Sequence, residues 1–191
     1  MPPKAKITKE MLIDAAFSIA RETGWENINA RAVAERLQCS TQPVMYHFAT
    51  VGELKKAAYS KADSYHTAYL MNVKGPQIML EIGLNYIRFA LEEPRLFRFL
   101  FQSGFFDGAT LLEMIDAEQL APVLSAMQSS VGGSTARVKE IFTTVFLFAH
   151  GYASIIANNS LSFDEEQIRS QLERAYKGAV LAAQEAREDK K

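Results

Sequence analysis

NARAVAERLQCSTQPVMYHF, residues 29–48, contains two short helical patterns separated by a polar connection. The first, over about 30–37, repeats apolar residues at the spacing of one buried helix face. The second, over about 41–48, accommodates Pro43 in its first turn, where backbone N–H groups have no partner inside the helix. Two short helices joined by a turn of about three or four residues predict a helix-turn-helix, which we place at 29–48.

The second of these helices has two chemically different faces. Val44, Met45 and Phe48 are expected to form its buried apolar face. The remaining side chains can form hydrogen bonds, and a glutamine amide can pair with adenine through two of them. These hydrogen-bonding residues are Thr41, Gln42, Tyr46 and His47.

Helical patterns continue on both sides of this segment. A preceding helix is expected over 8–23, capped by Thr8, and a following helix over 50–71, opened by a capping box of Thr50 and Glu53. Because sustained period-two alternation is absent, an all-α fold is predicted. Further helices are expected at about 77–92, 95–101, 110–117, 122–130, 134–158 and 162–187.

The clearest break in the chain is Gly75-Pro76, which follows a long helix. We place the domain boundary inside that helix, which predicts an N-terminal domain over 6–66 and a larger helical domain over 67–191. The net charge of −1 hides an asymmetry, because residues 1–60 carry +2 and residues 61–191 carry −3. A basic N-terminal segment followed by an acidic remainder of the chain is weak evidence for a polyanionic partner.

The sequence also indicates where the protein acts. Cys39 is the single cysteine, so an internal disulfide is impossible and nothing indicates an oxidising compartment. The N-terminal residues lack the apolar stretch of a signal peptide, and the expected location is the cytoplasm. Residues 141–163 carry no charge, but polar side chains interrupt them, so a helix buried in protein is expected there rather than a membrane span.

Residues 8–57 resemble the DNA-binding domain of the tetracycline-repressor family. The matching motifs are Thr8-Lys-Glu-Met-Leu-Ile-Asp-Ala-Ala-Phe17, Gly24-Trp25, Asn29-Ala-Arg-Ala-Val-Ala-Glu-Arg-Leu37, Tyr46-His47-Phe48 and Glu53-Leu54. The resemblance implies that Gln42 and Pro43 face DNA bases and that Arg31 reaches a base or a phosphate. It assigns phosphate contacts to the pair Tyr46-His47. The candidate DNA-binding residues are Arg31, Ser40, Thr41, Gln42, Pro43, Tyr46, His47 and Lys55.

Three positions depart from the common pattern of that family: Asn29 stands in place of Thr, Gln38 in place of Gly and Val51 in place of Lys. The missing lysine would contact a phosphate, and no Lys or Arg lies between Leu37 and Leu54. Because phosphate neutralisation supplies most non-specific affinity, we expect weaker and less salt-dependent DNA binding than is usual in the family. Partial substitutes are the lysines Lys4, Lys6, Lys9, Lys55 and Lys56.

Part of the remaining chain resembles the C-terminal domain of a subgroup of this family that is named for a Trp-His-Gly pattern. The match is carried by residues 86–98 and by His150-Gly151-Tyr152-Ala153, with Phe146 at the place of the Trp. Dense aromatic residues here fit two interpretations, an apolar effector pocket or simple packing between helices. As a lone histidine on an apolar helix, His150 fits a core position better than a metal site. The candidate pocket residues are Tyr65, Tyr69, Tyr86, Phe89, Phe97, Phe101, Phe105, Phe142, Phe146 and His150.

The last two helices carry more apolar surface than one small domain is expected to bury. Their apolar residues recur at helical spacing, which predicts a two-fold homodimer through a four-helix bundle. The residues concerned are Ile141, Val145, Phe148, Tyr152 and Ile155 in one helix and Leu172, Tyr176, Ala179 and Ala183 in the other.

Together these features predict a ligand-responsive DNA-binding transcriptional regulator. The expected form is a repressor that a small apolar or aromatic effector releases from a double-stranded DNA operator. An alternative is a dimeric helical ligand-binding protein with weak or lost DNA binding, which Val51 suggests. An enzyme is not expected, because the sequence offers no nucleophile–base pair, paired carboxylates or metal-ligand spacing. No cofactor, metal or membrane partner is expected either.

Overall fold

The computed structural model describes residues 7–74, 76–106, 110–116, 118–159 and 163–188. All regular structure within these ranges is helical, and they contain no strand. The all-α prediction is therefore confirmed. The chain divides into two compact units: Met1–Tyr65 with Arg95–Phe106, and His66–Pro94 with Asp107–Lys191.

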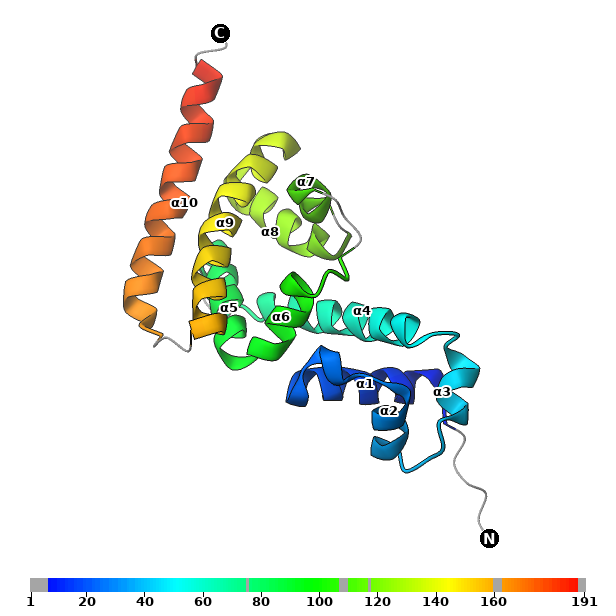
Figure 1. Cartoon of the computed structure of the whole chain (residues 1–191). Coiled ribbons are helices and arrows are strands. Elements are labelled where there is room, and N and C mark those ends of the chain that lie inside the picture. Colours follow the sequence, from blue (N-terminus) through cyan, green and yellow to red (C-terminus); the bar gives the residue numbers. More distant parts are fainter. Residues whose placement is uncertain (1–6, 75, 107–109, 117, 160–162, 189–191) are drawn as a thin grey trace. The chain divides into compact units, whose positions relative to one another are not determined.

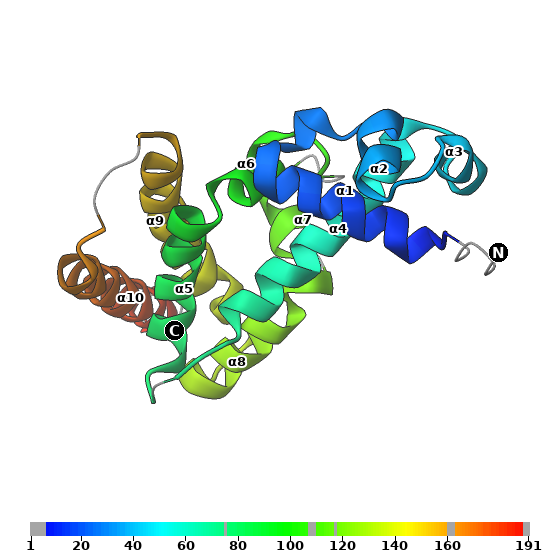
Figure 2. The ribbon, with the colours of Figure 1, turned by 90° about the horizontal axis from the view of Figure 1, so that it is seen from below.

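The first unit contains two short helices within residues 29–48. Its helices are α1 (Lys9–Thr23), α2 (Ala30–Arg36), α3 (Gln42–His47), most of α4 (Val51–Leu70) and nearly all of α6 (Pro94–Gln102). α2 packs against both α1 and α3, and the two ribbon views show α3 next to α2 (Figures 1 and 2). Buried alanine, leucine, isoleucine and valine side chains of α1 and α2 form the core at this place.

Side-chain caps fix where these helices begin. Thr8 and Asn29 accept hydrogen bonds from first-turn N–H groups of α1 and α2, at 3.2 and 2.9 Å. At α4, the Thr50 hydroxyl accepts the N–H of Glu53 at 3.1 Å. The Glu53 carboxylate accepts the N–H of Ala49 at 3.0 Å, one residue earlier than in the usual capping box. The starts of all three helices therefore follow from local sequence.

The turn between α2 and α3 requires one residue in the left-handed backbone region. Gln38 has a φ of +52°, and it is the only non-glycine residue with positive φ in the described part of the chain. Its N–H donates to the carbonyl of Glu35 at 3.0 Å, and the N–H of Cys39 donates to the carbonyl of Ala34 at 2.9 Å. This pair of bonds is a Schellman motif, whose left-handed position favours glycine. Glycine would therefore be less strained than Gln38 at this position.

We expect Gln38→Gly to stabilise the protein by about 0.5–1 kcal/mol. Removing the Cβ relieves left-handed strain of roughly 1–2 kcal/mol, and the greater freedom of glycine in the unfolded chain offsets part of that gain. Urea unfolding of the two proteins measures the difference. Gln38→Ala keeps the Cβ and is the matched control, so equal stability of the Gly and Ala variants would contradict the prediction.

The second unit is built around α9 (Thr135–Asn159). α5 (Ile78–Glu92), α8 (Ala121–Val131) and α10 (Glu165–Glu188) all pack against it (Figure 1). Two short elements precede α8, namely α7 (Leu111–Ile115) and a 3-10 turn at Glu118–Leu120. The last helix was expected to begin at residue 162, which lies outside the described residues.

The length and composition of α9 would allow it to cross a bilayer, which is weak evidence by itself. Eight of its residues are buried within the protein, including Ile141, Phe146 and Ala153. A helix with so many buried positions serves as the core of a helical unit. This agrees with the expectation of a helix buried in protein.

A polar network joins the end of α4 to α5 and α10 inside the second unit. The buried Asn85 donates from Nδ2 to the carbonyls of Leu70 and Asn72, both at 3.2 Å. Its Oδ1 accepts a hydrogen bond from Arg88 at 3.0 Å, and Arg88 pairs with Glu165 of α10 at 2.5 Å. The Arg88 guanidinium lowers the pKa of the Glu165 carboxyl. Asn85 thereby satisfies the carbonyl of Leu70 at the end of α4 and that of Asn72 just beyond the helix.

Candidate nucleic-acid interface

α3 presents a polar face to solvent because its apolar face is anchored in the first unit. Val44 and Phe48 are 2% and 4% exposed, so they fix the rotation of the helix. Gln42 and Tyr46 lie on the opposite side, where each is exposed, and Tyr46 retains 82% of its surface. The helix therefore offers an amide and a phenol to a partner outside the chain.

Met45 does not belong to the buried face. Its side chain is 56% exposed, so the prediction that it packs inward with Val44 was wrong. Each residue of a helix turns about 100° from the one before it, so Met45 points away from the direction that Val44 and Phe48 share. It lies one turn after Gln42, on the flank of the exposed face.

The other predicted DNA-binding residues around α3 lie at or near the surface. Arg31, the second residue of α2, is exposed, as are Ser40 and Thr41 in the turn before α3. Pro43 is half-buried. His47 is half-buried as well, and its Nε2 lies 3.3 Å from the carbonyl oxygen of residue 7, to which a protonated Nε2 donates. Residues 40–47 thus form one continuous stretch, which Arg31 extends onto α2.

Two of the predicted lysine substitutes, Lys9 and Lys55, have aromatic partners within the first unit. Lys55 Nζ lies 5.0 Å from the centre of the Trp25 ring, and Lys9 Nζ lies 5.4 Å from the Phe48 ring. Such cation–π contacts hold an ammonium group over a ring face without neutralising it. Lys4 and Lys6 lie outside the described residues. Val51 is the first residue of α4 and is half-buried, so the start of this helix is apolar.

The candidate effector-pocket residues fall into both units. Those in the first unit pack on neighbouring rings: Phe105 contacts Trp25 at 5.5 Å, and Phe97 contacts Phe101 at 4.9 Å. Tyr65 packs edge-on against the ring of Phe17. The members in the first unit are Tyr65, Phe97, Phe101 and Phe105, and those in the second are Tyr69, Tyr86, Phe89, Phe142, Phe146 and His150.

In the second unit, Tyr86 and His150 form a polar pair within a cluster of aromatic rings. The Tyr86 hydroxyl lies 2.8 Å from His150 Nδ1. Burial raises the pKa of Tyr86 well above its usual value and lowers the pKa of His150. The phenol therefore keeps its proton, and its O–H donates a hydrogen bond to Nδ1 of a neutral imidazole. Phe146 contacts both side chains, and Phe142 stacks on Phe146 at 5.7 Å.

A second set of rings lies where α4 meets α5 within this unit. The Phe89 ring is fully buried and lies 5.3 Å from Tyr69 and 4.7 Å from His66. The Tyr69 hydroxyl donates to a Glu92 carboxylate oxygen at 2.6 Å. Burial lowers the pKa of His66 to about 3, so this imidazole is neutral near pH 7. The rings of His66 and Tyr69 pack edge-on against Phe89, and the three form a packed aromatic cluster.

A pocket of about 510 Å³ lies elsewhere in the second unit, between the start of α5, the end of α8 and the middle of α10. Its walls come from three segments that are distant in sequence, so no local pattern predicts it. Its lining contains apolar, hydroxyl and charged side chains. These are Pro76, Gln77, Ile78, Met79, Leu80, Ala126, Ser129, Ser130, Glu173, Tyr176 and Lys177. Within the described residues, no group of three or more His, Cys, Asp or Glu side chains is arranged to hold a metal ion.

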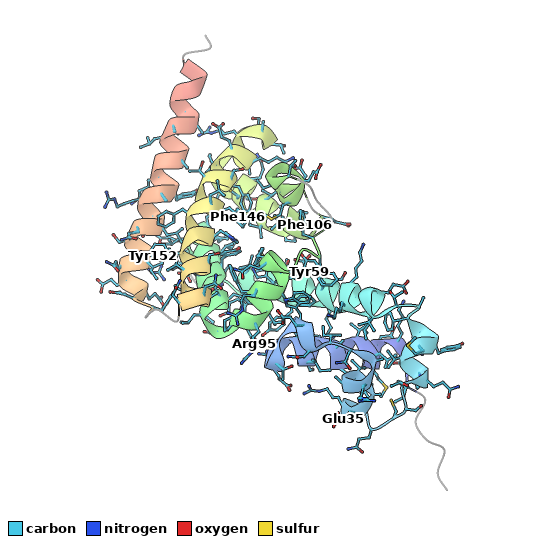
Figure 3. All side chains as sticks on the ribbon, viewed as in Figure 1. Glu35, Tyr59, Arg95, Phe106, Phe146 and Tyr152 are labelled. Atoms are coloured by element: carbon cyan, nitrogen blue, oxygen red, sulfur yellow. The ribbon has the colours of Figure 1, made fainter. Side chains whose placement is uncertain are left out.

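The apolar stripes expected at a dimer interface are partly used up inside the protomer. Four of the expected interface residues are already buried in the protomer: Ile141, Leu172, Ala179 and Ala183. The expectation that a partner subunit covers them was wrong. The reason is that α9 and α10 pack against each other and against α5. Figure 3 shows Tyr152 on the side of α9 facing α10, where its hydroxyl donates to Gln171. The large apolar side chains that remain exposed on these two helices are Leu147, Ile155 and Leu181.

The chain is similar to a transcriptional regulator. It is 22% identical over 182 residues to YobS, an uncharacterized HTH-type transcriptional regulator of Bacillus subtilis (strain 168). The match covers 89% of this chain and 90% of that protein, so it extends well beyond residues 29–48. No protein-family model matches the chain.

Proposed function

We propose that the chain is a DNA-binding transcriptional regulator that inserts α3 into the major groove of double-stranded DNA. The observation that carries this proposal is the orientation of α3. Buried Val44 and Phe48 turn Gln42 and Tyr46 outward, directly after a tight turn from α2. This is the arrangement in which the second helix of a helix-turn-helix reads base edges. The similarity to an HTH-type regulator over nearly the whole chain supports it.

The proposal includes a homodimer formed through α9 and α10. Three large apolar side chains of these helices stay exposed in the protomer: Leu147 at 51%, Ile155 at 51% and Leu181 at 58%. A second copy would cover them, and a two-fold dimer would present two copies of α3 to two DNA half-sites. We place the regulator in the cytoplasm, where DNA and small-molecule effectors are both accessible.

The second unit is proposed to bind the effector, with repression relieved on binding. The ring cluster around Tyr86 and His150 supplies one hydrogen-bonding pair in apolar surroundings, which suits an aromatic or apolar molecule. The pocket between α5, α8 and α10 is a second candidate, with Ser129 and Lys177 as polar groups. Titration should show one effector molecule bound per protomer. Loss of binding in His150→Leu supports the ring cluster as the effector site, whereas loss of binding in Ser129→Trp supports the pocket.

The alternative function, a dimeric ligand-binding protein with weak DNA affinity, is favoured by one observation. The first residue of α4 is the apolar Val51, which offers no cation to a phosphate. Fluorescence anisotropy separates the two functions, using a labelled duplex from the DNA flanking the gene and a scrambled duplex of equal composition. Tighter binding to the native duplex at about 100 mM salt supports the regulator. Equal and weak binding to both duplexes supports the alternative.

Val51→Lys should make DNA binding tighter and more salt-dependent. A lysine at the start of α4 adds one phosphate contact per half-site, which steepens the slope of log affinity against log salt by about 0.9, or about two per dimer. Affinity should rise alike on native and scrambled duplexes, because phosphate contacts carry no sequence information. Anisotropy titrations at several salt concentrations measure the slope.

The matched control is Leu91→Lys, at an exposed position of α5 in the second unit. It adds the same charge to the protein and should leave the slope unchanged. An unchanged slope for Val51→Lys would remove the start of α4 from the DNA interface.

A further inference from the structure

The exposed face of α3 carries no Lys, Arg, Asp or Glu, and beside the phenol of Tyr46 it presents two chemically distinct groups. Gln42 supplies an amide with one donor and one acceptor side. Met45, one helical turn later, supplies a flexible thioether that is 56% exposed. No Lys or Arg lies between Leu37 and Leu54, so no guanidinium or ammonium group comes from the turn or from α3.

These groups differ in the base pairs they can recognise. Guanine presents two acceptors, O6 and N7, in the major groove, and arginine or lysine reads them best. Adenine presents a donor at N6 and an acceptor at N7, which match both sides of the Gln42 amide. Thymine alone presents a C5-methyl group, which apolar side chains contact. An amide beside a thioether therefore matches adenine and thymine better than it matches guanine and cytosine.

We infer that α3 reads A·T base pairs, with Gln42 on adenine and Met45 on the C5-methyl group of a neighbouring thymine. This inference rests on the proposed function, because it presupposes that α3 enters the major groove. It makes Met45 a residue that determines operator sequence, although the sequence pattern assigned it to the core. The outward turn of Met45 away from buried Val44 is the structural fact on which this depends.

The first experiment identifies the base pairs that α3 contacts. The full-length protein selects from a duplex pool with 20 randomised base pairs, and the retained duplexes are sequenced. The selection is repeated with Gln42→Ala and with Met45→Ala. We expect the wild-type sites to contain A·T pairs at positions where each variant loses its preference, with a loss for Gln42→Ala of roughly five- to 150-fold per half-site.

The second experiment tests the methyl contact alone. Uracil replaces the thymines whose preference Met45→Ala erases, which removes only the C5-methyl group. Wild-type affinity should fall about fourfold per half-site, the equivalent of one buried methyl group. Met45→Ala should bind the thymine and uracil duplexes equally, whereas Met45→Leu should keep the difference. Uracil at thymines outside the half-sites is the duplex control and should change nothing.

Two results would overturn the inference while leaving the proposed function intact. One is selection of G·C pairs at the positions that Gln42→Ala or Met45→Ala erases. The other is equal wild-type affinity for thymine and uracil duplexes. Retention of no duplex at about 50 mM salt is a different result, because it removes DNA binding and with it the proposed function.

Discussion

Phe99→Ala should cost the first unit about 3–5 kcal/mol of stability, the usual loss for a fully buried phenylalanine. The Phe99 ring is 0% exposed and stacks on Trp25, with 6.0 Å between ring centres. It also meets Tyr59 at 5.6 Å and Phe105 at 5.8 Å. Truncation leaves a cavity among these three rings, which belong to the same unit.

Trp25 makes this loss directly observable, because it is the single tryptophan of the chain and lies in the affected cluster. Urea unfolding followed by its emission reports the first unit. Leu91→Ala, at a 40% exposed position of α5, is the control and should change stability by less than about 0.5 kcal/mol. A loss below about 1.5 kcal/mol for Phe99→Ala would show that α6 contributes little to the stability of the unit with which it packs.

Ile155→Glu should convert the proposed dimer into a monomer. Ile155 is 51% exposed in the protomer, so a glutamate there remains solvated when the chain is alone. In a dimer through α9 and α10, two copies of the carboxylate would be buried without partners, at a cost of several kcal/mol each. Sedimentation velocity at micromolar concentration measures the state of association. The variant should also lose the affinity gained from reading two half-sites together.

The position of this substitution follows from the packing of α9. Tyr152 is a poorer choice, because its hydroxyl bonds to Gln171 in the same chain and a glutamate would disturb the protomer itself. Leu91→Glu is the matched control, since it introduces the same charge at an exposed leucine of α5. A dimer that survives Ile155→Glu would place the interface on another surface.

Local sequence signals were sufficient for most helix positions. Thr8 and the Thr50–Glu53 pair begin their helices as expected, because a cap depends on residues within one turn. The 3-10 turn at Trp25–Asn27 was not predicted, because it carries no cap or periodicity of its own. Residue 38 was recognised as unusual in sequence, but its left-handed backbone was visible only in the structure.

Long-range packing decided the remaining differences. Nothing local to residues 95–106 shows that they join Trp25 and Tyr59 in the first unit. The burial of Leu172 depends on α5, where Gly83 has no side chain and lets α10 approach closely. Met45 lies about 100° from Val44 around the helix, at the edge of an ordinary apolar stripe, so the sequence pattern alone did not exclude it from the core. The candidate DNA-binding and pocket residues remain predictions.

The absence of charge on α3, the helix proposed to enter the major groove, also affects how quickly the protein would locate its operator. Proteins with many phosphate contacts bind any DNA firmly and slide along it, so most of their time is spent at wrong sites. Here the turn, α3 and the start of α4 contribute no cation from residue 38 to residue 54. Residence on non-operator DNA should therefore be brief, and the search should proceed mainly through solution. A small number of copies would then suffice to occupy the operator, because the rest of the genome competes weakly for them.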